Sequence, residues 1–144
     1  MPKPSPEQLD PARYPFSTEI APYFRDLDIN RHVNNSAMAS LLEEARVRYN
    51  RWLGYHKLAA QLGIDTMVAA VTIDYLAQGG YPQPFEMHIG CIHIGRTSNR
   101  IAILVRQNGR AIVFSEAITV CTKDGQPVEM PSAYRAALAK VMLP

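Results

Sequence analysis

The longest amphipathic stretch of the chain constrains its fold more than any other feature. Apolar residues recur every three or four positions between about residues 35 and 53: Met38, Leu41, Leu42, Ala45, Tyr49, Trp52 and Leu53. This spacing matches the 3.6-residue period of an α-helix that buries one face. Asn34 or Asn35 is a suitable N-cap, and Gly54 is a suitable end for the helix. The chain must therefore pack one long helix against a broad apolar surface.

Strand-like segments supply that surface. They are residues 14–25 before the helix and residues 66–77, 84–97, 99–107 and 110–122 after it. Asn108-Gly109 lies between the last two and predicts a hairpin, because a type I′ turn needs positive φ at both central residues. Two further short helices are expected, one at residues 55–62 and one that begins at Pro131-Ser132.

The order of these elements predicts the fold class. One strand, one long helix and four consecutive strands contain no βαβ repeat, so a parallel doubly wound sheet is not expected. The prediction is an α+β fold in which an antiparallel β-sheet wraps around one long central helix. The strands are apolar on both faces, which favours a homo-oligomer, either a homodimer or a homotetramer. Residues 1–13 contain four prolines and are expected to form a flexible N-terminal arm before a single domain at 14–144.

Composition excludes several classes of function. The formal charge is +2 and no basic block occurs, so we expect no nucleic-acid partner. Cys91 and Cys121 lie far apart, which predicts neither a metal site nor a disulfide framework, and no cofactor is expected. No apolar run reaches the roughly 18 residues of a membrane helix, and the first residues lack the apolar region of a signal peptide. We therefore expect a cytoplasmic protein with no membrane partner.

The chemically richest stretch lies directly before the long helix. Residues 25–35 read RDLDINRHVNN and hold two carboxylates, one His and three Asn between a strand end and a helix start. A helix N-terminus offers free backbone N–H groups and the positive end of the helix dipole. Asp and Asn before a helix are also common as caps and turn residues. A Ca²⁺ loop is not expected, because Arg31 stands where the loop requires Gly.

This stretch resembles a motif of a known family. DLDINRHVNN, followed by a helix with Glu-Glu-Ala-Arg and a β-meander, resembles the hotdog-fold thioesterases, in particular the 4-hydroxybenzoyl-CoA thioesterase-like group. The loop is especially similar to the DLDxNxHVNN motif of plant acyl-ACP thioesterases. The resemblance runs from about Tyr14 to Met142. It implies a hotdog fold, with pairs of domains that join into one continuous sheet and share their active sites.

The resemblance also implies which residues act. Asp28 corresponds to the catalytic acid, while Asn30 and His32 correspond to the motif Asn and His. A backbone N–H near Asn35 corresponds to the oxyanion donor, and Glu44 to the Glu inside the family helix. Plant enzymes carry two such domains and further catalytic residues in the late strands. This chain has one domain, so those late residues are not assigned.

The chemistry of the residues agrees with hydrolysis of acyl-CoA or acyl-ACP. A helix N-terminus can donate N–H bonds to the oxyanion that forms at the thioester carbonyl. Asp28 could attack this carbonyl and form an anhydride, or it could take a proton from water. In the second scheme His32 could share the role of base, with Asn30 orienting either partner. Glu44 fits an exposed charge as well as a residue that faces the substrate.

Candidate substrate contacts lie later in the chain. Arg96, Thr97, Ser98 and Arg100 stand between two strands, where similar enzymes line the coenzyme A path, although a plain polar turn fits them equally. Tyr75 could line an acyl tunnel or belong to the core. Two other functions stay open, a non-catalytic hotdog protein that binds acyl thioesters and a hotdog dehydratase.

Overall fold

The structure is a computed structural model and describes residues 3–144. Its strands are β1 (Phe16–Ile20), β2 (Asp65–Tyr75), β3 (Phe85–Ile94), β4 (Ser98–Gln107), β5 (Arg110–Lys123) and β6 (Gln126–Pro127). Its α-helices are α1 (Asn35–Trp52), α2 (Tyr55–Leu62) and α3 (Ser132–Ala139), with 3₁₀ turns η1 (Pro11–Arg13) and η2 (Phe24–Asp26). The strands form one antiparallel sheet in the order β1-β3-β4-β5-β2, and β6 pairs with β5.

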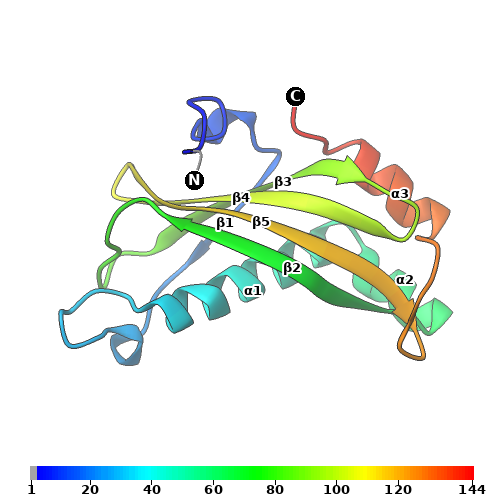
Figure 1. The fold of residues 1–144 in the computed structure, drawn as a ribbon, viewed down its shortest axis with the longest axis horizontal. Helices are drawn as coiled ribbons and strands as arrows, with labels where there is room; N and C mark the ends of the chain where they lie inside the picture. Colours follow the sequence, from blue (N-terminus) through cyan, green and yellow to red (C-terminus); the bar gives the residue numbers. More distant parts are fainter. Residues whose placement is uncertain (1–2) are drawn as a thin grey trace.

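Helix α1 crosses the inner face of this sheet, as Figure 1 shows. Its buried residues are Met38, Leu41, Leu42, Ala45 and Tyr49, the stripe expected from the sequence, and they join the inner residues of the strands in one core. Asn34 caps the helix, with its side-chain oxygen accepting the N–H of Ala37 at 2.7 Å. Gly54 follows the helix with φ of 80°. The expected α+β architecture, an antiparallel sheet around one long helix, is confirmed.

The first strand is shorter than expected. β1 ends at Ile20, whereas the alternating pattern continues to Arg25. Pro22 has no backbone N–H for a ladder, and the chain turns into η2 directly after it. The Asn108-Gly109 turn is confirmed, with φ of 53° and 75° at its two residues. β6 was not expected, and it forms because the turn at Asp124-Gly125 returns the chain along β5.

The N-terminal arm lies over the outer face of the sheet. Tyr14 is buried there against Ala102, Leu104 and Phe114, and its hydroxyl donates to the Gln8 carbonyl at 2.7 Å. Leu143 from the other end of the chain packs on the same cluster. These contacts join residues far apart in the sequence. The flexibility of the arm at residues 1–13 stays a prediction. Residues 1 and 2 of that arm lie outside the described residues.

Strand β2 forms one edge of the sheet. Its side chains are mostly exposed, and Met67, Val68, Val71 and Tyr75 are among the exposed large apolar residues. An exposed edge strand carries unpaired backbone groups that can pair with another strand. The edge is therefore suited to the expected pairing with a second copy, which stays a prediction.

Candidate active site

The loop between η2 and α1 is a small closed hairpin. Leu27 and Val33 form an antiparallel bridge, and the Asn34 N–H donates to the Asp26 carbonyl at 2.9 Å. Within the hairpin, the Asp28 N–H donates to the His32 carbonyl at 2.9 Å. Arg31 adopts φ of 61°, a left-handed conformation that closes the tip. The local hydrogen bonds of the DLDINRHVNN stretch thus define the position of Asp28.

The Asp28 carboxylate is held by its own loop. Its Oδ1 accepts the backbone N–H of Asn30 at 2.9 Å and that of His32 at 3.1 Å. For Oδ2, the described residues provide no hydrogen-bond donor. Asp28 and Asn30 are exposed and His32 is half-buried. Asp28 therefore stabilises the turn through one oxygen and leaves the other oxygen free.

The helix N-terminus offers donors of its own. Met38 and Ala37 use their N–H groups inside the cap, the first to the Asn34 carbonyl and the second to the Asn34 side chain. In residues 3–144, no acceptor is found for the backbone N–H groups of Asn35 and Ser36. Such groups at the positive end of a helix dipole favour an oxyanion.

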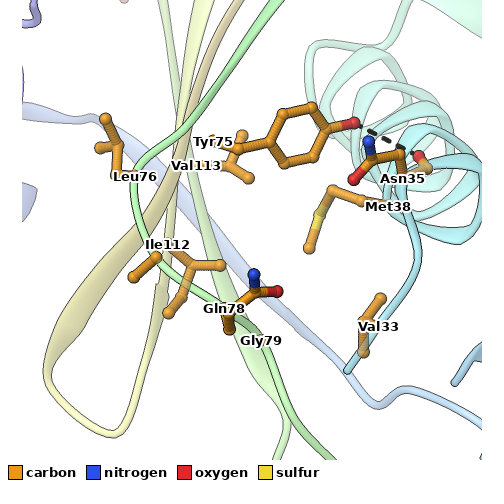
Figure 2. Close-up of a pocket in the computed structure, with 10 residues that line it drawn as sticks. Val33, Asn35, Met38, Tyr75, Leu76, Gln78, Gly79, Ile112 and Val113 are labelled. Atoms are coloured by element: carbon orange, nitrogen blue, oxygen red, sulfur yellow. Dashed lines mark hydrogen bonds between the residues drawn. The ribbon is translucent and has the colours of Figure 1, made fainter. Parts of the chain in front are cut away.

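A cleft of about 380 Å³ opens between this helix start and the end of β2. Its lining comes from the loop and α1 (Val33, Asn35, Met38), from β2 and the segment after it (Tyr75, Leu76, Ala77, Gln78, Gly79), and from β5 (Ile112, Val113). Figure 2 shows Tyr75 reaching across from β2 to α1, where its hydroxyl donates to the Asn35 carbonyl at 3.4 Å. Partial burial raises the pKa of Tyr75 above its usual value.

The cleft and the Asp28 loop are joined through the backbone. The Val33 N–H donates to the Gly79 carbonyl at 2.9 Å, which ties the loop to the wall of the cleft after β2. Asn35 and Tyr75 are the two predicted site residues that line the cleft. Asp28, Asn30 and His32 lie on the adjoining hairpin and do not line it.

Glu44 does not lie with these residues. Its carboxylate pairs with the Arg48 guanidinium at 3.1 Å, and Arg48 also donates to Thr18 and to the Glu19 carbonyl of β1. Glu44 therefore faces the β1 side of α1, whereas the cleft opens on the β2 side. The sequence placed Glu44 on the helix correctly, but the direction of its side chain depends on the sheet.

The predicted coenzyme A contacts also lie away from the cleft. Arg96 and Thr97 form the turn between β3 and β4, where their carbonyls accept the N–H groups of Met130 and Cys121. Ser98 begins β4 and Arg100 pairs with Glu116 across the sheet at 3.8 Å. This turn lies at the α3 end of the sheet, and the hairpin of Asp28 lies at the other end (Figure 1).

Sequence reasoning missed several cleft residues. Val33 and Met38 have the pattern of ordinary core residues, and Ile112 and Val113 have that of a strand. Gln78 and Gly79 lie between the strands expected at residues 66–77 and 84–97. Gly79 carried one usable signal, because Gly recurs where a neighbouring group leaves no room for a Cβ. A Cβ on Gly79 would lie 2.7 Å from the Phe85 ring.

Residues 3–144 contain no group of three or more His, Cys, Asp or Glu side chains placed to hold a metal ion. In the same residues, no helix is long and apolar enough to cross a membrane.

Similarity to known proteins identifies the family of this chain. The family model of the thioesterase-like superfamily matches residues 23–138. A thioesterase from Thermus thermophilus, solved with coenzyme A and zinc, is 28% identical, with a TM-score of 0.79 over 88% of this chain and 93% of that one. A predicted thioesterase from Bacillus stearothermophilus is 25% identical, with a TM-score of 0.80 over 88% and 96%.

A further solved structure agrees in fold. The PA5185 protein of Pseudomonas aeruginosa is 25% identical, with a TM-score of 0.82 over 92% of this chain and 94% of that one. A search of curated proteins found no significant match. The fold and these similarities define a hotdog-fold thioester hydrolase. The chain belongs to the thioesterase-like superfamily.

Proposed function

We propose that this protein hydrolyses acyl thioesters of coenzyme A at the helix N-terminus beside Asp28. The observation that carries the proposal is the junction of three features: a held carboxylate, two free backbone N–H groups and an acyl-sized cleft. The cleft volume of about 380 Å³ falls within the range of small-molecule sites. The coenzyme A in the Thermus thermophilus relative supports a CoA-type substrate. An acyl carrier protein thioester is the alternative.

The proposed reaction needs few groups, because a thiolate leaves readily. The thioester carbonyl lies at the start of α1, where the N–H groups of Asn35 and Ser36 donate to the developing oxyanion. Asp28 Oδ2 takes a proton from a water molecule as that water attacks the carbonyl carbon. The tetrahedral intermediate then expels the thiolate, which takes the proton back from Asp28, and the acid and thiol leave. In the other scheme Oδ2 attacks directly and water hydrolyses the resulting anhydride.

The neighbours of Asp28 have distinct proposed roles. The backbone N–H groups of Asn30 and His32 hold Oδ1, so that Oδ2 faces the reacting atoms. In the general-base scheme the half-buried His32 side chain is proposed to share the proton. The Asn30 amide orients the water or the carboxylate. Glu44 has no proposed contact with substrate in one chain, because it pairs with Arg48 on the β1 side.

Substrate binding is proposed to need a second copy. Antiparallel pairing of two β2 edges would bring the Asp65 end of one strand beside the Tyr75 end of the other. The partner's far end then approaches the cleft, which offers a route for its Arg96, Thr97, Ser98 and Arg100 to meet the coenzyme A moiety. The acyl group occupies the cleft between Met38 and Val113, with Tyr75 at its side.

Thiol release from a panel of short, long and aromatic acyl-CoAs tests the proposal. Asp28→Asn keeps an oxygen for the Asn30 and His32 N–H groups and removes the charge. We expect it to lower kcat by about 10²-fold or more, the range for loss of a general base. Asp26→Asn is the matched control, because Asp26 caps η2 at the Tyr23 N–H, 2.7 Å away, in the same loop. We expect that variant to stay within about threefold of the wild type.

The outcomes separate the alternatives. An active wild type with an unimpaired Asp28→Asn variant would move the base to His32. If the wild type is inert on the CoA panel but hydrolyses acyl-ACP, the substrate is a thioester of acyl carrier protein and not of coenzyme A. An inert wild type that still binds acyl-CoA in calorimetry would identify a non-catalytic binding protein, and hydration of an enoyl thioester would identify a dehydratase.

A further inference from the structure

Gln107 is a buried amide that no part of the proposed mechanism uses. It ends β4 and is only 5% exposed. Its Nε2 donates to the carbonyls of Gly80 at 2.9 Å and Gln83 at 2.8 Å. Its Oε1 accepts the Gly80 N–H at 2.9 Å. One side chain thus satisfies three backbone groups of a segment more than 20 residues away in the sequence.

That segment connects β2 to β3 and contains no helix or strand. It includes Gly79, which packs so closely on Phe85 that a Cβ would lie 2.7 Å from the ring. The close packing on Phe85 therefore restricts the position of the Gly79 backbone. The neighbouring Gly80 is hydrogen-bonded to Gln107 through both its N–H and its carbonyl. Because β4 is the central strand of the order β1-β3-β4-β5-β2, Gln107 ties the connection to the middle of the sheet.

The anchored segment in turn holds the Asp28 hairpin. The Gly79 carbonyl accepts the Val33 N–H at 2.9 Å, and Val33 is paired with Leu27 across the hairpin. Asp28 lies between these two paired residues. A continuous path of backbone contacts and hydrogen bonds therefore runs from Gln107 through Gly80, Gly79 and Val33 to the hairpin.

We propose that Gln107 is a positioning residue for the thioester reaction, holding the Asp28 hairpin and the cleft wall at a fixed separation. Gln107 does not itself line the cleft, so it acts through Gly79 and Val33. The proposal rests on the proposed role of Asp28. An amide fits this place because it offers one acceptor and two donors to one N–H and two carbonyls.

Two substitutions test the role in different ways. Gln107→Met keeps the approximate volume but removes the side-chain partner of three part-buried backbone groups. Gln107→Glu keeps the acceptor for Gly80 N–H but places a carboxylate against two carbonyl oxygens. In steady-state assays with the best acyl-CoA, we expect kcat to fall about 10- to 100-fold in both variants, since a displacement of about 1 Å can have this effect. We expect KM to change by less than about threefold.

Ile103→Val is the matched control for lost stability. Ile103 is fully buried on the same strand, and loss of one methylene there lowers stability. The side-chain hydrogen bonds to Gly80 and Gln83 come from Gln107 and not from Ile103. We expect its kcat to stay within about twofold of the wild type at temperatures where all variants are folded. An equal loss of kcat in Ile103→Val would overturn the proposal, because general destabilisation would then explain the effect.

A double-mutant cycle asks whether Gln107 acts through Asp28. In the Asp28→Asn background, we expect Gln107→Met to change kcat by less than about threefold, because the group it positions is already disabled. Full multiplication of the two losses would contradict a positioning role. If Asp28→Asn alone is as active as the wild type, the proposed role of Asp28 fails and the base moves to His32. If Asp28→Asn is impaired but both Gln107 variants are not, only the positioning role fails.

Hydrogen exchange supplies a measurement independent of activity. We expect the Val33 amide to exchange at least about tenfold faster in Gln107→Glu than in the wild type, although Gln107 does not touch Val33. The exchange of α3 amides is the internal reference. If Gln107→Met does not fold, the comparison of Gln107→Glu with the wild type still tests the proposal. An unchanged exchange rate of the Val33 amide in Gln107→Glu would refute the proposed connection from Gln107 to the hairpin.

Discussion

Gly79→Ala tests the close packing that fixes the wall of the cleft. The added Cβ would lie 2.7 Å from Cζ and 2.8 Å from Cε1 of Phe85, distances that ordinary contacts do not reach. Phe85 is fully buried, so its ring cannot move into solvent. Overpacking of this kind costs about 1–3 kcal/mol. For a chain of this size, that corresponds to a Tm lower by about 2–12 °C.

Gly80→Ala is the control, one residue further along. A Cβ there meets no atom within 4 Å, and φ is not positive. The backbone N–H and carbonyl that bond to Gln107 remain in place. We therefore expect no loss of stability, and up to about 0.4–1 kcal/mol of gain from the lower entropy of the unfolded chain.

Urea and thermal unfolding of the two variants provide the assay, with thiol release measured alongside. We expect Gly79→Ala to lose both stability and kcat, since the Gly79 carbonyl holds Val33. The reasoning is refuted if Gly79→Ala unfolds at the wild-type temperature. Equal destabilisation by Gly80→Ala would also refute it, because the effect would then come from the backbone and not from Phe85.

Three further substitutions probe the site and the arm. Tyr75→Phe removes the hydroxyl that donates to Asn35, and we expect kcat/KM to fall about 3- to 10-fold in the thiol-release assay. We expect Glu44→Gln to keep kcat within about twofold of the wild type, because Glu44 pairs with Arg48 on the β1 side. A loss of about 10²-fold would instead show that Glu44 takes part in the reaction. Burial raises the pKa of Tyr14 from 10.0 to about 12, so its neutral form stabilises the folded state below pH 10 and this contribution is lost as pH rises toward 12. We therefore expect Tyr14→Phe to flatten the decline of unfolding free energy with pH above about pH 10, measured by urea titration.

The sequence determined the elements and their order. The apolar stripe with a period of 3.6 residues identified α1 almost to the residue. The reason is that the apolar side chains of an amphipathic helix must all face one apolar surface. A cap at Asn34 or Asn35 and a turn at Asn108-Gly109 depend only on local backbone chemistry, so both were predictable, and the structure selects Asn34 as the cap. The placement of Asp28 in the loop before the helix also followed from neighbouring residues alone.

Tertiary structure alone decided which of these residues meet. Tyr75, Gln78 and Gly79 line one cleft with the start of α1 because the end of β2 lies beside it, a neighbour relation that depends on strand order. Glu44 faces β1 because the packed stripe fixes the rotation of α1 against the sheet. The role of Gln107 lies in hydrogen bonds to backbone groups distant in sequence, and no local pattern encodes such bonds. Periodicity specifies which face of an element is buried, but only packing specifies what lies opposite that face.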